Sequence, residues 1–223
     1  MAKIKKAYEC TNCGHSQPLW AGKCPECGKW GTLTEVTVKE TKGKTSEIID
    51  DKSAKKLNAI EINESQRLKS DYEEFDRAVG GGLVRDSVTI LTARPGAGKS
   101  TLLLQLSKSY ADLGLKVLYV SGEESESQIK SRADRIMESL PENVWILSTN
   151  SMDSAANEIK NIDADIVFLD SIQTFTLAAF DNKAGSPTQT IEVANKAVEI
   201  AKDEFKKRAI IMIGHMTKAN EMA

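Results

Sequence analysis

Short apolar runs alternate with longer amphipathic stretches from about residue 57 to the end of the chain. The runs are rich in β-branched residues, and they predict buried strands at residues 87–91, 116–120, 144–147, 165–169 and 209–214. The stretches between them predict helices at residues 99–113, 125–140, 154–161 and 188–207. Strands that alternate with helices indicate an α/β fold with a mostly parallel sheet, which binds ligands at the carboxyl ends of its strands.

The N-terminal part of the chain follows a different pattern. Residues 1–36 are rich in Cys, Gly and Trp, whereas residues 37–56 are polar, Lys-rich and aperiodic, as is typical of a flexible linker. We therefore predict three parts: a small ribbon at residues 1–36, a linker at 37–56 and an α/β core at 57–223.

Composition and charge narrow the class of protein. Hydrophobic residues make up 40% of the 223 residues and charged residues 28%, which is ordinary for a globular protein. No run approaches the roughly 18 apolar residues of a membrane span, and we see no secretory signal, so we expect no membrane partner. All four cysteines lie between residues 10 and 27, which argues against a disulfide scaffold, so we expect a cytoplasmic protein. Residues 1–56 hold 11 Lys and Arg against 7 Asp and Glu, whereas residues 57–223 hold 19 against 25. A basic arm on an acidic body permits contact with nucleic acid without requiring it.

All four cysteines lie in the predicted ribbon, as two CxxC pairs. Thiolates at this spacing can converge tetrahedrally on Zn²⁺, and so short a module needs a metal because it cannot bury an adequate core. Two disulfides or a redox motif are the alternatives, and neither fits paired CxxC motifs in a reducing compartment. The predicted zinc ligands are Cys10, Cys13, Cys24 and Cys27.

A phosphate-binding loop is predicted between the first strand and the first helix of the core. The segment ARPGAGKS at residues 93–100 occupies the P-loop frame, with Ala93 in place of the first glycine. Its backbone N–H groups can surround a phosphate, Lys99 can charge-pair with it, and Ser100 can ligate Mg²⁺. The residues predicted to bind ATP here are Arg94, Pro95, Gly96, Ala97, Gly98, Lys99, Ser100 and Thr101.

Acidic residues at two further strand ends complete the predicted site. Asp170 closes the fourth predicted strand, where its carboxylate would hold Mg²⁺. Hydrolysis also needs a group that orients or deprotonates water, and Glu123 follows the second predicted strand at the same sheet edge, with Glu124 as the alternative. We therefore predict Glu123 and Lys99 as catalytic residues, and ATP, Mg²⁺ and Zn²⁺ as cofactors.

These motifs together resemble the RadA/Sms family of bacterial recombination and DNA-repair ATPases. The similar stretches cover nearly the whole chain and include CTNCGHSQPLWAGKCPECGKWGTL, EFDRAVGGGLV, GKSTLLLQ, YVSGEES, QIKSRADRI, FLDSIQT, AGSPTQTIE and GHMTK. The resemblance implies a RecA-like fold and a ring-forming ATPase that DNA stimulates. It further implies that the protein promotes branch migration of recombination intermediates.

The resemblance also implies partners and further site residues. The partners would be single-stranded or branched DNA, other copies of the chain in a ring, and a recombinase or helicase. Residues 171–174 would couple the γ-phosphate site to a DNA-binding loop, and His215, Thr217 and Lys218 would form a sensor region. The DNA contacts would come from Lys183, Ala184, Gly185, Ser186, Thr188 and Gln189.

The chain departs from the family pattern at several positions. Ala93–Arg94 and Arg85–Asp86 replace the usual residues, and the chain stops at Ala223 before the family's KNRFG motif and its Lon-protease-like domain. We therefore expect a fragment or a truncated product. Two functions stay open: a DNA-stimulated motor, or an ATP- and zinc-binding module with little turnover of its own. A regulatory kinase or clock-type ATPase would share the P-loop but would not account for the ribbon.

Overall fold

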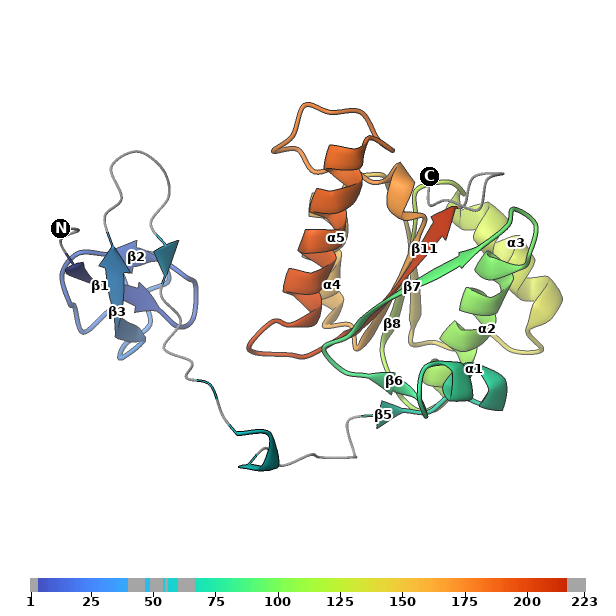
Figure 1. Ribbon diagram of the computed structural model, residues 1–223, viewed down its shortest axis with the longest axis horizontal. Helices are drawn as coiled ribbons and strands as arrows, with labels where there is room; N and C mark the ends of the chain where they lie inside the picture. Colours follow the sequence, from blue (N-terminus) through green and yellow to red (C-terminus); the bar gives the residue numbers. More distant parts are fainter. Residues whose placement is uncertain (1–3, 40–46, 49–53, 55, 60–66, 216–223) are drawn as a thin grey trace. The chain divides into compact units, whose positions relative to one another are not determined.

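The computed structural model describes residues 4–39, 47–48, 54, 56–59 and 67–215. The chain divides into two compact units, residues 1–62 and 63–223. The first unit holds a four-stranded antiparallel sheet in the order β2-β1-β3-β4, and Figure 1 shows its longer strands β1 and β3. Its elements are β1 (Ile4–Cys10), β2 (Ser16–Gln17), β3 (Leu33–Lys39), β4 (Glu47–Ile48) and the short helix η1 (Leu57–Ala59).

Strand pairing continues into the segment that the sequence predicts as a linker. β3 runs to Lys39, and Val38 pairs with Ile48 of β4. Alternating Thr and Val after Leu33 favour an extended chain, which explains why the strand passes residue 36. Residues 40–46, 49–53 and 55 of the predicted linker lie outside the described residues, and the three-part division stays a prediction.

A five-stranded sheet in the order β7-β11-β10-β8-β9 forms the centre of the second unit. Every neighbouring pair is parallel, which confirms the predicted α/β fold. All five predicted strands are present, within a few residues of the expected ends. Their bounds are β7 (Val88–Ala93), β8 (Val117–Ser121), β9 (Val144–Ser148), β10 (Ile166–Asp170) and β11 (Ala209–His215).

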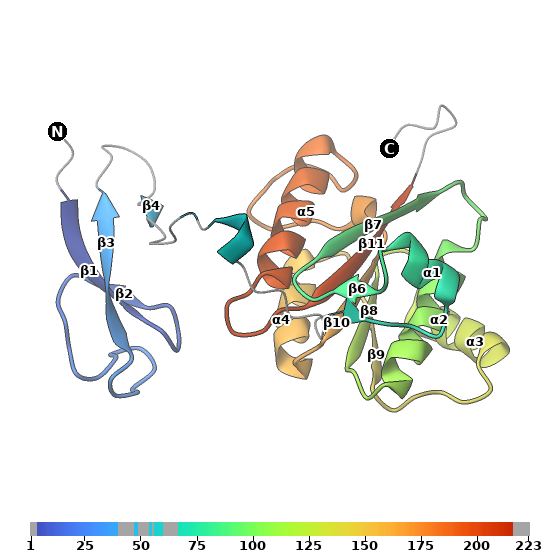
Figure 2. The same cartoon turned by 60° about the horizontal axis from the view of Figure 1, so that its bottom comes forward.

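Helices cover both faces of this sheet. Figures 1 and 2 show α4 and α5 on one face and α2 and α3 on the other. The helices are α1 (Glu73–Ala78), α2 (Lys99–Asp112), α3 (Glu126–Ile136), α4 (Met152–Ile162), α5 (Pro187–Ala201) and the short η3 (Ile172–Thr174). A small antiparallel pair, β5 (Arg67–Leu68) and β6 (Leu83–Val84), precedes the sheet. Among the described residues, no helix has the length and apolar character to cross a membrane.

The central strands are buried on both faces, so their side chains alternate between two cores. Tyr119 and Phe168 pack into the core under α2, whereas Val120 and Leu169 pack into the core under α4 and α5. The alternation fixes the register of β8 and β10, because a shift by one residue would exchange the two sets. The two cores therefore hold the carboxyl ends of the strands in a constant arrangement.

Two helices end earlier than their apolar pattern predicts. α5 stops at Ala201 rather than near residue 207, because Oδ1 of Asp203 accepts the N–H groups of Phe205 and Lys206 in a local turn. α3 stops at Ile136 rather than near residue 140, since Met137 is extended and packs into the same core as Ile136. Neither change alters the carboxyl edge of the sheet.

Candidate metal and nucleotide sites

The four cysteines converge in the ribbon. Their sulfur atoms all lie within 4.8 Å of one another, with 3.6 Å between the Sγ atoms of Cys10 and Cys27 and 3.6 Å between those of Cys13 and Cys24. Four sulfurs bound at about 2.3 Å to a tetrahedral ion lie about 3.8 Å apart, so this cluster fits Zn²⁺.

The same turn brings each CxxC pair to the cluster. Gly14 N donates to Cys10 O at 2.8 Å and Gly28 N donates to Cys24 O at 2.9 Å. Both glycines have a positive φ, 73° and 69°, which residues with a Cβ rarely adopt. The Thr32 hydroxyl lies 3.2 Å from Cys10 Sγ and lowers the pKa of that thiol to about 6. A thiol with so low a pKa is available as a thiolate, which is the form that binds metal.

The predicted phosphate loop lies at the carboxyl edge of the sheet, between β7 and α2. Gly96 and Gly98 have φ angles of 77° and 87°, and a Cβ on either would meet nothing within 4 Å. Conformation rather than crowding therefore requires glycine at both positions. The residues from Arg94 to Gly98 are exposed, and Ser100 and Thr101 are half-buried in the first turn of α2. The N–H groups of such a turn have no partner within the helix, so they are free to bind an anion.

Lys99 is the buried cation of this loop. Its side chain crosses back under the loop, and Nζ donates to Ala93 O at 3.0 Å and to Arg94 O at 3.4 Å. These carbonyls satisfy an ammonium group that would otherwise be costly to bury. The loop thus carries one fixed positive charge beside the helix N-terminus.

Asp170 ends β10 and is 3% exposed. The hydroxyl of Tyr119 on the neighbouring strand donates to Asp170 Oδ2 at 2.6 Å. Burial first and the Asp170 carboxylate second raise the pKa of Tyr119, while a hydrogen bond with the Ser100 side chain acts in the opposite direction. Of the two predicted Mg²⁺ ligands, Asp170 therefore accepts a hydrogen bond from the Tyr119 hydroxyl, and Ser100 lies near enough to influence the pKa of that hydroxyl.

Glu123 follows β8 and faces the ends of two other strands. Its Oε1 accepts a hydrogen bond from Ser171 Oγ at 2.6 Å and lies 2.8 Å from Nε2 of His215. Partial burial raises the pKa of Glu123, but Ser171, His215 and the charge of Lys99 outweigh it and hold the pKa below its usual range. The carboxylate is consequently ionised at neutral pH and able to accept a proton.

The alternative, Glu124, has a different environment. It forms an ion pair with Arg132 of α3, and its N–H donates to Ser121 Oγ at 3.0 Å. Its Oε2 is buried without a hydrogen-bond partner among the described residues. The ion pair directs this carboxylate toward α3, so Glu123 is the better-placed base.

Gly122 and Thr174 bring the ends of β8 and β10 together in a way that the motifs do not indicate. A Cβ on Gly122 would lie 2.2 Å from Thr174 Oγ1, which is far inside any real contact. Gly122 N donates to Asp170 O at 2.8 Å, and the peptide bond between Asp170 and Ser171 is cis. The contacts of Gly122, Thr174 and Tyr119 depend on strand order, which the sequence does not show directly. The Tyr119 hydroxyl, within the apolar run of β8, is the one local signal that the sequence offers.

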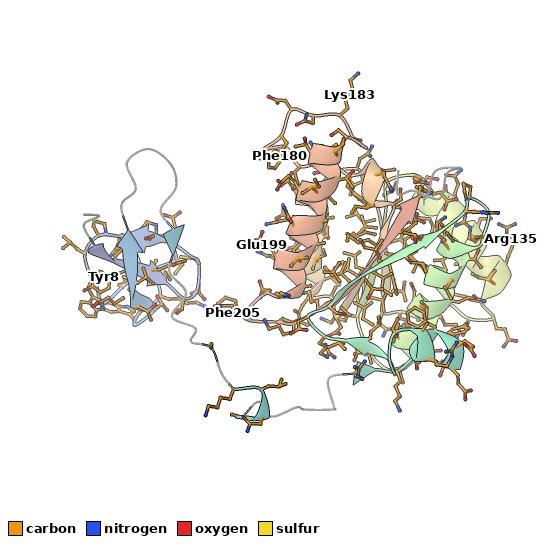
Figure 3. All side chains as sticks on the ribbon, viewed as in Figure 1. Tyr8, Arg135, Phe180, Lys183, Glu199 and Phe205 are labelled. Carbon is orange, nitrogen blue, oxygen red and sulfur yellow. The ribbon has the colours of Figure 1, made fainter. Side chains whose placement is uncertain are left out.

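The predicted DNA loop precedes α5 and lies at the same end of the unit as the carboxyl edge of the sheet (Figure 1). Lys183, Ala184, Gly185 and Thr188 are exposed, and Figure 3 shows Lys183 pointing away from the core. Ser186 Oγ caps α5 by accepting from the N–H of residue 189 at 3.3 Å.

Gln189 has a role that the sequence analysis did not predict. It is 1% exposed, and its Nε2 donates to the carbonyl oxygens of Leu177, Phe180 and Asn182. Its Oε1 accepts the N–H of Leu177 at 2.9 Å. The amide therefore holds the base of the loop. Direct contact of Gln189 with DNA stays a prediction, and it would require the side chain to give up these hydrogen bonds.

A parallel sheet with a glycine loop between a strand and a helix defines the class of P-loop nucleotide-binding domains. A family model described as an AAA domain matches residues 54–221, and one described as a rubredoxin metal binding domain matches residues 8–35. The chain therefore belongs to the AAA-domain family, and its N-terminal part is a metal-binding ribbon.

Similar proteins extend this assignment. The chain is 37% identical over 232 residues to the DNA repair protein RadA of Campylobacter jejuni. This alignment covers 100% of this chain and 50% of that protein. It is 36% identical over 228 residues to the DNA repair protein RadA of Bacillus subtilis, with coverages of 100% and 49%. For the DNA repair protein RadA of Mycobacterium tuberculosis, identity is 35% over 226 residues, with coverages of 100% and 47%. The predicted resemblance to the RadA family is confirmed, and the chain spans about half the length of these curated relatives.

Proposed function

We propose that this chain is an ATP-hydrolysing domain that acts in DNA repair. We further propose that single-stranded DNA stimulates its ATP hydrolysis. One observation carries the proposal: Lys99, Asp170 and Glu123 lie at the carboxyl edge of the sheet, where Asp170 ends β10, Glu123 follows β8, and Lys99 begins the helix after β7. A cation, a buried carboxylate and an ionised carboxylate are the groups that phosphoryl transfer to water requires. The AAA-domain match and the RadA relatives support the same reading.

Each residue has a distinct task in this proposal. The backbone of residues 94–98 and the first turn of α2 would bind the phosphates, with Lys99 leaving its loop carbonyls to reach them. Ser100 and Asp170 would hold Mg²⁺, which supplies charge neutralisation at the phosphates when bound. Glu123 would orient a water molecule and accept its proton.

The ribbon contributes stability to its own unit in this proposal. Four thiolates leave no open coordination position on a tetrahedral ion, so Zn²⁺ there would be structural. The described part of the ribbon buries few side chains, chiefly Cys10, Cys24 and Leu33. A core this small requires the metal to hold the sheet together.

The DNA part of the proposal rests on the loop before α5. Its exposed Lys183 offers charge and its exposed Gly185 a backbone donor, and the exposed Thr188 in the first turn of α5 offers a hydroxyl donor to phosphates. The relatives are named as DNA repair proteins. We propose ring assembly, branch migration and a recombinase or helicase partner on the same resemblance, with a cytoplasmic location. Thr217 and Lys218 of the expected sensor region lie outside the described residues.

ATP hydrolysis by this chain, measured with and without single-stranded DNA, tests the proposal. Lys99→Ala is the blank, and binding of a fluorescent ATP analogue is measured in parallel. Turnover above the blank that rises with DNA is the expected result. ATP binding without turnover would instead identify a binding module, and absence of binding would contradict the site.

A further inference from the structure

His215 connects the last strand of the sheet to the proposed base. It ends β11, while Glu123 follows β8, and β10 lies between these two strands in the sheet. The Nε2 atom of His215 nevertheless lies 2.8 Å from Glu123 Oε1. An ionised carboxylate only accepts hydrogen bonds, so Nε2 must carry the proton of this bond.

The backbone of His215 is itself held by one side chain. The Oε1 atom of Gln173 in η3 accepts the N–H of His215 at 3.3 Å, and the Nε2 atom of Gln173 donates to His215 O at 3.4 Å. The side-chain amide of Gln173 thus forms hydrogen bonds with both the backbone N–H and the backbone carbonyl of His215. Because η3 begins two residues after the end of β10, these hydrogen bonds link the ends of β10 and β11.

Both hydrogen bonds to Glu123 fall on the same carboxylate oxygen. Ser171 Oγ–H and His215 Nε2–H donate to Oε1, while no described residue contacts Oε2 within hydrogen-bond distance. The Glu123 side chain is 39% exposed, so packing does little to restrain its rotation. The two donors therefore decide where Oε2 points.

We propose that His215 is a positioning residue for Glu123, a role that rests on the proposed hydrolytic function. It fixes Oε1 so that Oε2 faces the water to be activated. Loss of the imidazole leaves Ser171 as the single restraint, and the carboxylate samples rotamers in which no water is held. The expected result is a loss of rate at saturating ATP without a loss of ATP binding. His215 is the register partner of Ala93 at the start of the phosphate-loop segment, but this pairing of β11 with β7 is made by the backbone and does not depend on the imidazole.

Steady-state hydrolysis by the whole chain separates these effects. His215→Ala is expected to lower kcat about tenfold, a part of the 10²–10⁴ that general-base catalysis supplies, with the KM for ATP unchanged. His215→Gln retains a donor at similar reach and should restore part of the loss. A kcat in His215→Ala equal to that of the wild type, or a change confined to KM, would overturn the proposal. Absence of turnover in the wild type would instead contradict the proposed hydrolytic function.

Gln173→Ala tests whether the hydrogen bonds from Gln173 to the backbone of His215 help to position Glu123. It should lower kcat in the same direction, and its effect should not add to that of His215→Ala, because both remove one restraint. Additive losses would mean that Gln173 acts elsewhere.

Imidazole ¹⁵N NMR tests the contact without any turnover. The chain contains two histidines, so His15→Ala assigns the signals of His215. The expected spectrum has His215 protonated at Nε2, and Glu123→Gln should shift its ring resonances while those of His15 stay in place. Unchanged His215 resonances in Glu123→Gln would show that the two side chains do not interact and would overturn the proposal.

Discussion

The hydroxyl of Tyr119 on β8 donates a hydrogen bond of 2.6 Å to Asp170 Oδ2 on the neighbouring strand β10, and both side chains are buried. A buried carboxylate is costly unless it accepts hydrogen bonds, so this bond offsets part of the cost of burying the Asp170 side chain. Tyr119→Phe should therefore destabilise the chain by about 2 kcal/mol, the range for hydrogen bonds to charged groups.

Urea unfolding followed by circular dichroism measures this loss. Tyr110→Phe is the matched control, because the Tyr110 hydroxyl is also buried but makes no hydrogen bond of good geometry within the described part of the chain. Equal unfolding free energies for the two variants would contradict the account of Asp170.

Gly122→Ala should disturb the junction of β8 and β10. The new Cβ would lie 2.2 Å from Thr174 Oγ1 and 2.8 Å from Thr174 Cβ, so one strand end must shift. We expect a loss of about 1–3 kcal/mol in the free energy of unfolding and a lower kcat, because Glu123 is the next residue. Addition of Thr174→Gly should recover part of both. A fully active and stable Gly122→Ala chain would show that this contact does not position the base.

Cys24→Ser should remove the metal and loosen the ribbon, since a tetrahedral site loses one of its four thiolates. ATP affinity of the second unit should stay unchanged, because the phosphate loop lies within residues 63–223. Elemental analysis and ATP-analogue binding on the same sample check both statements. Loss of ATP binding together with the metal would show that the two units depend on each other.

Much of the fold could be predicted from sequence, because buried parallel strands leave uninterrupted apolar runs and the P-loop has a fixed order of residues. The contacts that complete the site could not be predicted in the same way. Glu123, Ser171 and His215 meet only because β10 lies between β8 and β11, and strand order leaves no local signal. The end of α5 was also missed, since the turn at Asp203 interrupts a pattern that still reads as helical.

Asp165, at the opposite edge of the sheet, should make the free energy of unfolding depend on pH. Partial burial raises the pKa of Asp165, but the N–H of Lys116 at 2.9 Å and the charges of Lys206 and Arg85 outweigh it and hold the pKa below its usual range. A depressed carboxyl pKa contributes stability above the unfolded value of about 3.9, and that stability is lost as the pH falls through the folded value.

Asp165→Asn should accordingly cost about 1–3 kcal/mol at pH 7, and the difference from the wild type should shrink as the pH falls below about 4. Urea unfolding of both chains at a series of pH values gives the loss at pH 7 and its change with pH. A difference that stays constant down to about pH 3, below the ordinary carboxyl pKa, would mean that the charge of Asp165 is not what stabilises this edge.

The central claim, that the strand-end cluster hydrolyses ATP with Glu123 as its base, is tested most directly by comparing Glu123→Gln with Glu124→Gln. We predict that Glu123→Gln binds an ATP analogue as the wild type does but loses turnover by a factor of about 10²–10⁴. Glu124→Gln, which weakens the ion pair with Arg132, should keep turnover within a few-fold of the wild type. Loss of turnover in Glu124→Gln with activity retained in Glu123→Gln would contradict the account.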